Sequence, residues 1–327
     1  MIISRTPFRI SFAGGGSDLA SYYSDEPGMV LSTAIDKHMY IAVKEHFDRT
    51  FRISYSRTEI VNSVDQIEHR IVREVLGQLN FREGLEIVSM GDLPARTGLG
   101  SSSSFTVGLL HALYALQSRV VSAERLASEA CRIEIDQLHE PIGKQDQYIA
   151  AYGGLQFIQF NPDGSVFIDP VVCKRETRRE LNRRLLAFFT GDTRDTRDIL
   201  SKQRANTPDK KPMLRKMCSI ARDLRDVLTI GRDLNAFGNL LHQAWEAKRS
   251  LEQSISNPKI DEFYDRGLRA GAIGGKLLGA GGGGFLLFFC EPHKQDGLRA
   301  ELAELRELKF SFDPEGTKIV HIGSDRD

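Results

Sequence analysis

The residues best suited to chemistry lie in one short segment, PARTGLGSSSS, which spans positions 94–104. This segment follows a run with the alternation of a strand and continues directly into FTVGLLHALYALQ, which has the spacing of a helix. The first N–H groups of a helix have no intrahelical partner and carry the positive end of its dipole, so they favour phosphate oxygens. A helix cap needs only one serine, whereas four serines after two glycines favour a phosphate-binding loop.

This phosphate loop differs from a Walker A loop, because no Lys-Ser or Lys-Thr pair follows its last glycine. A second glycine segment, GAGGGG at 279–284, formally contains the G-x-G-x-x-G fingerprint of dinucleotide-binding enzymes. That fingerprint must follow a strand and open a helix near the start of a βαβ unit, but here the strand-like run FLLFF comes next. The context therefore argues against a Rossmann oxidoreductase, which stays an alternative.

A third glycine segment, AGGGSD at 13–18, comes directly after the first expected strand. One interpretation is a turn in which Asp18 caps the next helix. The other is that the glycines let a polar ligand approach while Asp18 accepts hydrogen bonds from its hydroxyl groups. The residues alone leave both interpretations open.

Two acids near a helix break could serve phosphoryl transfer. Pro141 and Gly143 interrupt the helical pattern, and Asp146 lies just beyond them. Phosphoryl transfer needs a metal that bridges phosphate oxygens and an aspartate that orients or deprotonates the acceptor hydroxyl. Asp146 suits the aspartate role, while Glu134 and the Ser102 hydroxyl are candidate ligands for Mg²⁺. Each acid could instead be a solvated helix or turn residue.

Several other classes find no support. The eight histidines include no H-x-x-x-H pair, and no G-x-S-x-G surrounds the serines, which argues against zinc and serine hydrolases. The 44 basic residues balance 44 acidic ones, so we expect no overall attraction to nucleic acid or to an anionic membrane. No apolar stretch reaches the ~18 residues of a membrane span. The four cysteines have no paired spacing, which fits reduced thiols in a cytoplasmic protein.

The elements that must position these residues alternate between sheet and helix, which predicts a mixed α+β fold. We expect strands within 1–60, a helix from 65 to 79, a strand at LEIVSM, helices at 105–116 and 122–136, a hairpin of LQFIQF around the NPDG turn, a strand at LLAFF, helices between 195 and 270, a strand at FLLFF, a helix from 292 and a strand at 317–322. The charged run KRETRRELNRR at 174–184 is either a connector or a solvated helix. A length of 327 residues allows about two domains. We place them at 1–175 and 176–327.

Three segments together resemble the GHMP kinases, the family of galactokinase, homoserine kinase, mevalonate kinase and phosphomevalonate kinase. They are RTPFRISFAGGGSDL, PARTGLGSS and KLLGAGGGGFLLFF, and GKQDQY between the last two resembles the G-x-x-D-Q of sugar kinases. The resemblance spans most of the chain. It implies an N-terminal domain like domain 2 of ribosomal protein S5 and a ferredoxin-like C-terminal domain, with ATP and the acceptor meeting in the cleft between them.

The resemblance also implies roles for particular residues. Asp146 would face the acceptor hydroxyl, and Arg9 would lie near the transferred phosphoryl group. The phosphates of ATP would be held by Pro94, Gly98, Leu99, Gly100, Ser101, Ser102 and Ser103, and Mg²⁺ by Ser102 and Glu134. The acceptor would be held by Gly15, Gly16, Ser17, Asp18 and Lys144, with Gly281 and Gly282 shaping the cleft beside it.

Within the family, AGGGSD, GLGSSSS, GKQDQY and FFTGDTR most resemble the members that act on D-glycero-D-manno-heptose 7-phosphate. The expected reaction phosphorylates the anomeric hydroxyl of this sugar and gives the 1,7-bisphosphate. This product is an early intermediate in the synthesis of nucleotide-activated heptose for surface polysaccharide. The second phosphate of the acceptor needs a basic clamp, and the candidates are Arg96, Lys144, Arg194 and Arg197.

One departure from the family pattern concerns the acceptor. Lys144 stands where other sugar kinases carry an apolar residue, which puts the identity of the acceptor in question but not the reaction class. The alternatives are a kinase for an unphosphorylated sugar such as fucose or galactose and a sugar-binding sensor without turnover. Glu134 and Asp146 argue against the sensor, because a pure binding protein needs neither.

Overall fold

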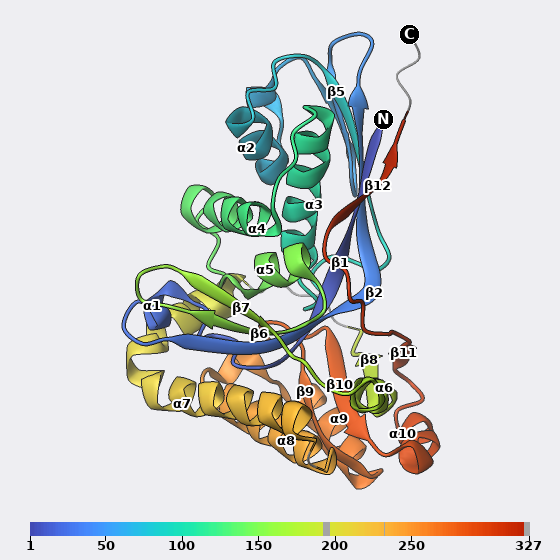
Figure 1. Cartoon of the computed structure of the whole chain (residues 1–327). Coiled ribbons are helices and arrows are strands. Elements are labelled where there is room, and N and C mark those ends of the chain that lie inside the picture. Colours follow the sequence, from blue (N-terminus) through green and yellow to red (C-terminus); the bar gives the residue numbers. More distant parts are fainter. Residues whose placement is uncertain (192–196, 232, 324–327) are drawn as a thin grey trace.

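Two β-sheets organise the chain, and the computed structural model describes residues 1–191, 197–231 and 233–323 of it (Figure 1). The first sheet and its helices fill the upper part of Figure 1, and the second sheet with α7–α10 fills the lower part. Within the described ranges no helix is both long and apolar enough to cross a membrane. All four cysteines are free.

The first sheet has eight strands in the order β12-β1-β2-β5-β3-β4, with β6 paired to β2 and β7 paired to β6. Its strands are β1 (Ile2–Ala13), β2 (Gly28–Glu45), β3 (Phe51–Ser54), β4 (Thr58–Val61), β5 (Leu85–Gly91), β6 (Leu155–Phe160), β7 (Val166–Pro170) and β12 (Lys318–Ile322). The helices of this part are α1 (Ala20–Tyr23), α2 (Arg70–Gln78), α3 (Ser101–Leu116), α4 (Ala123–Cys131) and α5 (Gln145–Tyr152), with a 3₁₀ turn at Val64–Gln66 and a π-helical turn at Arg132–Gln137.

A break in the β1–β2 ladder brings β1 to the phosphate loop. The register shifts between Pro7 and Phe8, where the missing N–H of proline would interrupt a regular ladder. Two residues further on, the N–H of Arg9 donates to the carbonyl of Leu99 at 3.0 Å. The middle of β1 is therefore joined to the loop that precedes α3.

The second sheet has the strand order β11-β8-β10-β9, and all of its pairs are antiparallel. Its strands are β8 (Leu185–Phe189), β9 (Ala272–Leu277), β10 (Phe285–Cys290) and β11 (Arg306–Leu308). The helices of this part are α6 (Arg175–Arg183), α7 (Arg197–Ile230), α8 (Asn235–Arg249), α9 (Pro258–Arg269) and α10 (Gln295–Glu301), with 3₁₀ turns at Gln253–Ile255 and Pro292–Lys294. From β8 to β11 the order is a strand, the three helices α7–α9, two strands, α10 and a last strand, which is the β-α-β-β-α-β order of a ferredoxin-like fold with three helices in place of the first one.

Most expected elements are confirmed, including the hairpin of β6 and β7, but four helices differ in their ends. The helix expected from 65 to 79 is α2, which begins at Arg70 after a separate 3₁₀ turn, and the helix expected from 292 is α10, which begins at Gln295 after another 3₁₀ turn. The helix expected at 105–116 begins at Ser101, because the serines themselves form its first turn. The helix expected at 122–136 is α4 followed by the π-helical turn. The charged run at 174–184 forms the solvated helix α6, of which Leu181 alone is buried.

One hydrophobic core serves both sheets, and a second lies within the first part. Phe12 of β1 is fully buried and packs edge-on against Phe237 of α8, with ring centroids 5.3 Å apart, and against Phe312 at 6.3 Å. The last strand, β12, returns to pair with β1. The division at 175/176 falls at the start of α6 and stays a prediction.

Candidate active site

Arg9 and Asp146 form a two-pronged ion pair between β1 and α5. The Nε of Arg9 donates to one carboxylate oxygen of Asp146 at 2.7 Å, and Nη2 donates to the other at 2.8 Å. The third donor, Nη1, binds the carbonyl of Gly98 at 2.6 Å. The side chain of Arg9 is buried, whereas that of Asp146 is 23% exposed and can face a ligand. The structure thus brings together two residues that lie 137 positions apart.

The phosphate loop passes directly over this ion pair. Gly100, at φ +76°, caps α3, and a Cβ there would meet Asp146 Oδ2 at 3.3 Å. Gly98, at φ +82°, would place a Cβ only 2.5 Å from the carbonyl of Leu278. Because both glycines combine positive φ with close contacts, a side chain at either position would move the loop. The free N–H groups at the start of α3 therefore lie beside Asp146, where they favour an anion.

Glu134 is fully buried in the π-helical turn next to the first turn of α3. Its carboxylate accepts hydrogen bonds from the hydroxyls of Ser102 and Ser103, each at 2.9 Å, and from Nε2 of Gln147 at 2.6 Å. Burial raises the pKa of Glu134, and the three hydrogen bonds oppose that rise only in part. The structure thus joins the two expected Mg²⁺ ligands, Ser102 and Glu134.

These residues fit Mg²⁺, which usually takes one or two protein oxygens together with waters and substrate phosphates. A buried carboxylate without a cationic partner is destabilised, and a bound divalent ion would relieve that cost. Among the described residues no cluster of three or more His, Cys, Asp or Glu offers a complete metal cage. A Mg²⁺ ion held by Glu134 and Ser102 would take its remaining ligands from waters and substrate phosphates.

Asp18 lies buried beneath the loop that leads into α5. Its Oδ1 accepts from the N–H of Gly16 at 2.8 Å, and its Oδ2 accepts from Nε2 of Gln145 at 3.1 Å. Burial raises the pKa of Asp18, and the nearby charge of Asp146 adds to that effect. Next to it, Gly15 faces Gln145 and the hydroxyl of Ser11. Ser11 Oγ and Gln145 Oε1 are buried without a partner in the described part of the chain. The amide oxygen can therefore accept a hydrogen bond from a ligand, and the hydroxyl can donate or accept one.

Other expected acceptor residues have their side chains engaged elsewhere. The hydroxyl of Ser17 is buried and bonds the carbonyls of Gly14 and Met29 at 2.8 and 3.1 Å. The ammonium of Lys144 lies 4.7 Å from the centre of the Tyr23 ring and donates to the carbonyl of Gly164 at 3.3 Å. The contacts of Ser17 and Lys144 with a substrate stay predictions.

The remaining clamp candidates are Arg96, Arg194 and Arg197, and the phosphate loop begins at Pro94. Arg96 and Pro94 are exposed on the loop. Arg194 lies outside the described residues, and so does the side chain of Arg197. A basic clamp for the second phosphate of the acceptor stays a prediction.

The second glycine segment closes against the phosphate loop. A Cβ on Gly279 would come within 2.4 Å of the Cα of Gly98, and one on Gly284 within 2.5 Å of the carbonyl of Thr97. Further along the segment, Gly281 and Gly282 are buried against the 3₁₀ turn at Gln253–Ile255, where the N–H of Gly282 donates to the carbonyl of Ile255 at 3.0 Å. The segment is followed by a strand and packs backbone to backbone against the phosphate loop. The contribution of Gly281 and Gly282 to the acceptor site stays a prediction.

Two buried lysines near the ion pair escaped the sequence analysis. Lys248 of α8 donates to the carbonyl of Gly279, and Lys276 of β9 donates to the carbonyls of Ser11 and Phe12 at 2.6 and 3.0 Å. Burial lowers the pKa of both, that of Lys248 to about 8. The sequence contains a pattern that could have identified Lys248. It follows Leu241, Ala244 and Trp245 at the spacing of a buried helix face, and lysine is rare on such a face unless a specific interaction holds it.

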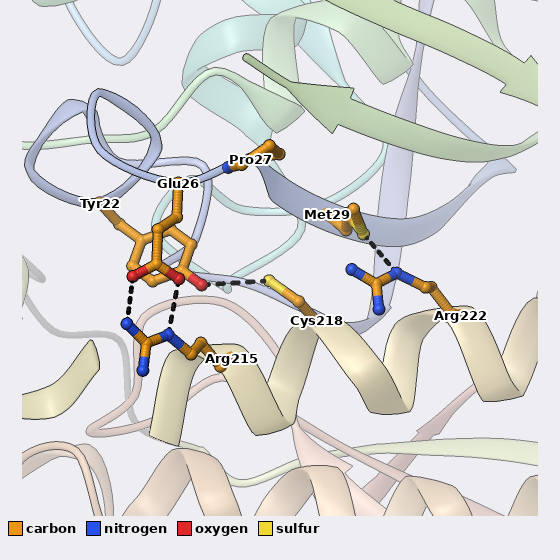
Figure 2. Close-up of a pocket in the computed structure, with 7 residues that line it drawn as sticks. All are labelled: Tyr22, Glu26, Pro27, Met29, Arg215, Cys218 and Arg222. Atoms are coloured by element: carbon orange, nitrogen blue, oxygen red, sulfur yellow. Dashed lines mark hydrogen bonds and ion pairs between the residues drawn. The ribbon is translucent and has the colours of Figure 1, made fainter. Parts of the chain in front are cut away.

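A separate cavity of about 350 Å³ lies where α7 faces α1 and the start of β2 (Figure 2). It is lined by Tyr22, Glu26, Pro27, Met29, Arg215, Cys218 and Arg222. Arg215 forms a two-pronged pair with Glu26 at 2.7 and 2.5 Å, and Nε of Arg222 points at the sulfur of Met29 at 2.9 Å. None of the expected site residues lines this cavity, so it is distinct from the Arg9–Asp146 site.

Fold and site together define a two-part enzyme of phosphoryl transfer. Models of the N-terminal and C-terminal domains of GHMP kinases match residues 59–154 and 220–307. The chain belongs to the GHMP kinase family.

Three relatives show what this chain is similar to. D-glycero-alpha-D-manno-heptose 7-phosphate kinase of Campylobacter jejuni is 29% identical over 344 residues, covering 98% of this chain and 99% of that protein. Galactokinase of Thermococcus kodakarensis is 27% identical over 352 residues, covering 95% of each. The crystal structure of a D-glycero-D-manno-heptose 1-phosphate kinase from Bacteroides thetaiotaomicron has a TM-score of 0.83 at 24% identity, covering 99% of this chain and 100% of that one, which supports the shared fold.

Proposed function

We propose that this protein transfers the γ-phosphoryl group of ATP to the anomeric hydroxyl of D-glycero-D-manno-heptose 7-phosphate. The observation that carries the kinase site is the Arg9–Asp146 pair beneath the N-terminus of α3, beside the Glu134–Ser102 pair. An anion site, an aspartate with an exposed edge and a hard-oxygen metal site are the three parts that phosphoryl transfer requires.

In the proposed mechanism each group has a separate task. The N–H groups of Ser101–Ser103 hold phosphate oxygens, and Mg²⁺ on Glu134 and Ser102 would neutralise their charge. Asp146 accepts the proton of the acceptor hydroxyl as that oxygen bonds to the γ-phosphorus and the bond to ADP breaks. Arg9 fixes the orientation of Asp146 and presents positive charge to the phosphoryl group.

The choice of acceptor rests on similarity and on the polar lining of the site. A heptose 7-phosphate kinase covers nearly the whole chain at 29% identity. Near Gly15, the buried atoms Ser11 Oγ and Gln145 Oε1 have no hydrogen-bond partner among the described residues and can form hydrogen bonds with sugar hydroxyls. We propose that these groups and Asp18 bind the sugar ring, and that Arg96 or Lys144 contributes to a clamp for the 7-phosphate.

One observation favours the alternative of an unphosphorylated sugar. The ammonium of Lys144 already contacts Tyr23 and the carbonyl of Gly164, so it must change partners before it can bind a phosphate. A galactokinase also aligns with 95% of the chain. A free sugar such as galactose or fucose is therefore the second candidate acceptor.

A panel of acceptors tests the proposal. The purified protein would be given Mg²⁺ and ATP with heptose 7-phosphate, heptose 1-phosphate, free heptose, fucose or galactose, and ADP release and the ³¹P spectrum of the product would be measured. We expect the highest kcat/KM with heptose 7-phosphate and a new anomeric phosphate signal. A preference for a free sugar would support the second candidate, and binding without ADP release for every sugar would support the sensor.

A further inference from the structure

Lys248 is a buried basic residue that forms no ion pair with an acid in the described part of the chain. It lies in the last turn of α8, is 6% exposed, and its one hydrogen-bond acceptor among the described residues is the carbonyl of Gly279. An ammonium has three donors, so two are left for another ligand. Burying a charge in this way is costly unless an interaction compensates it, and a methionine would fill similar space without that cost.

The contacts of Lys248 lead directly to the reacting groups. Gly279, which Lys248 holds, lies against Gly98, and the carbonyl of Gly98 accepts from Arg9. Arg9 in turn holds both oxygens of Asp146. Lys248 is therefore linked to the Arg9–Asp146 ion pair through the backbone of Gly279 and Gly98, although it belongs to the part of the molecule that contains the second sheet.

The charges around Lys248 also point to an anion. The charged groups that face it are Arg9 on β1, Asp18 just after β1, Asp146 on α5 and Lys276 on β9. Together with Lys248 they make three basic groups and two acids in a buried space, which is a net positive charge when all five groups are ionised. A site of net positive charge suits the phosphoryl oxygens, whose negative charge it must stabilise during transfer.

We propose that Lys248 is a positioning residue of the kinase site, which holds the second glycine segment against the phosphate loop through Gly279 and adds positive charge beside Arg9 and Asp146. The inference rests on the proposed kinase function and extends it to α8. Small shifts of a phosphate loop can lower the rate ~100-fold. The contact of Lys248 with Gly279 can therefore affect the rate even though Lys248 does not touch the substrate.

If the charge of Lys248 supports catalysis, kcat/KM should depend on the protonation of this lysine. Burial, with a further contribution from Arg9, lowers the pKa of Lys248 to about 8. In the wild type, kcat/KM should therefore fall as the pH rises above about 8, because Lys248 loses its proton. Lys248→Arg keeps its charge at every pH of the assay, so its profile should stay flat through this range.

The experiment compares the wild type with Lys248→Met, Lys248→Arg and the control Lys216→Met, which changes an exposed lysine of α7. We expect Lys248→Met to lower kcat/KM ~10–100-fold with no break near pH 8, Lys248→Arg to recover part of the activity, and the control to match the wild type. The proposal is overturned if all variants keep the wild-type break, or if Lys248→Met stays within about twofold of the wild type. If thermal melts show that Lys248→Met does not fold, the profile of Lys248→Arg decides.

A calorimetric titration with Mg²⁺ and ATP separates this inference from the proposed function. A wild type that phosphorylates no sugar contradicts the proposed function alone. In that case the same pH comparison is made on ATP affinity, which should weaken above pH 8 in the wild type and not in Lys248→Arg. Equal pH dependence of the two proteins would contradict the role of Lys248.

Discussion

At the scale of single residues, the site separates a carboxylate that faces the ligand from a carboxylate that is sealed. Asp146 is partly exposed and paired with Arg9, whereas Glu134 is buried among neutral donors. The first arrangement suits a group that exchanges a proton with an acceptor, and the second suits a metal ligand. The two acids should therefore respond differently to substitution.

Asp146→Asn removes the proton acceptor but keeps the shape of the side chain. We expect kcat to fall ~100-fold or more, with ATP affinity nearly unchanged, because the proposed mechanism has Asp146 act on the acceptor hydroxyl and not on ATP. Steady-state kinetics and calorimetry measure the two effects. Asp223→Asn changes an exposed residue of α7 and is the matched control. If Asp146→Asn kept the wild-type kcat, Asp146 would not be the group that accepts the proton of the acceptor hydroxyl.

Glu134→Gln should have opposite effects on activity and on stability. Its folded-state pKa lies above the unfolded value of about 4.3, so the carboxyl stabilises the fold fully below that pH, and this contribution is lost as the pH rises through the folded pKa. Without Mg²⁺, the Tm of the variant relative to the wild type should therefore rise between pH 4 and pH 8.

Activity and a control complete the test of Glu134. Loss of the metal ligand should lower kinase activity more than tenfold, by analogy with the ~10–100-fold losses seen when metal sites are disturbed. Glu83→Gln, at an exposed position, should change neither Tm nor activity. A pH-independent Tm difference for Glu134→Gln would show that the carboxyl is not the titrating group.

At the scale of elements, the phosphate loop depends on glycine at position 98. Gly98→Ala would force a Cβ to 2.5 Å from the carbonyl of Leu278 at a φ of +82°, so we expect the loop to shift and kcat/KM to fall ~100-fold. Gly77→Ala in α2 is the control, because no atom lies within 4 Å of the added Cβ. It should leave kinetics unchanged and stabilise the fold by roughly 0.5–1 kcal/mol. Wild-type kinetics for Gly98→Ala would contradict the close packing of the loops.

Local elements could be predicted from the sequence because their signals are local. The glycines and serines at 94–104 predicted the loop and α3, and the NPDG turn predicted the hairpin of β6 and β7. The π-helical turn at Arg132–Gln137 carries no comparable signal, since its residues also suit an α-helix. Lys276 and the return of β12 to β1 depend on contacts between positions more than 250 apart, which periodicity does not report.

At the scale of the whole molecule, the shared core predicts that both halves unfold together. Phe12→Ala should lower stability by ~3–5 kcal/mol, because a fully buried phenylalanine leaves a cavity. The only tryptophan, Trp245, lies in the other half, so its fluorescence should shift together with circular dichroism in a single transition. Phe47→Ala, at a fully exposed position, is the control. If Phe12→Ala left the midpoint of the tryptophan fluorescence transition unchanged, the two halves would unfold independently of each other.

The contact of Gly98 with Gly279 has a consequence for the evolution of such enzymes. Two stretches 181 positions apart in the chain meet with no side chain between them, so a change of shape in one demands a matching change in the other. Recombination that swaps the front half of one relative for that of another would keep both halves foldable and still misalign donor and acceptor. We expect hybrids of this kind to regain turnover only when both meeting stretches are taken from the same parent.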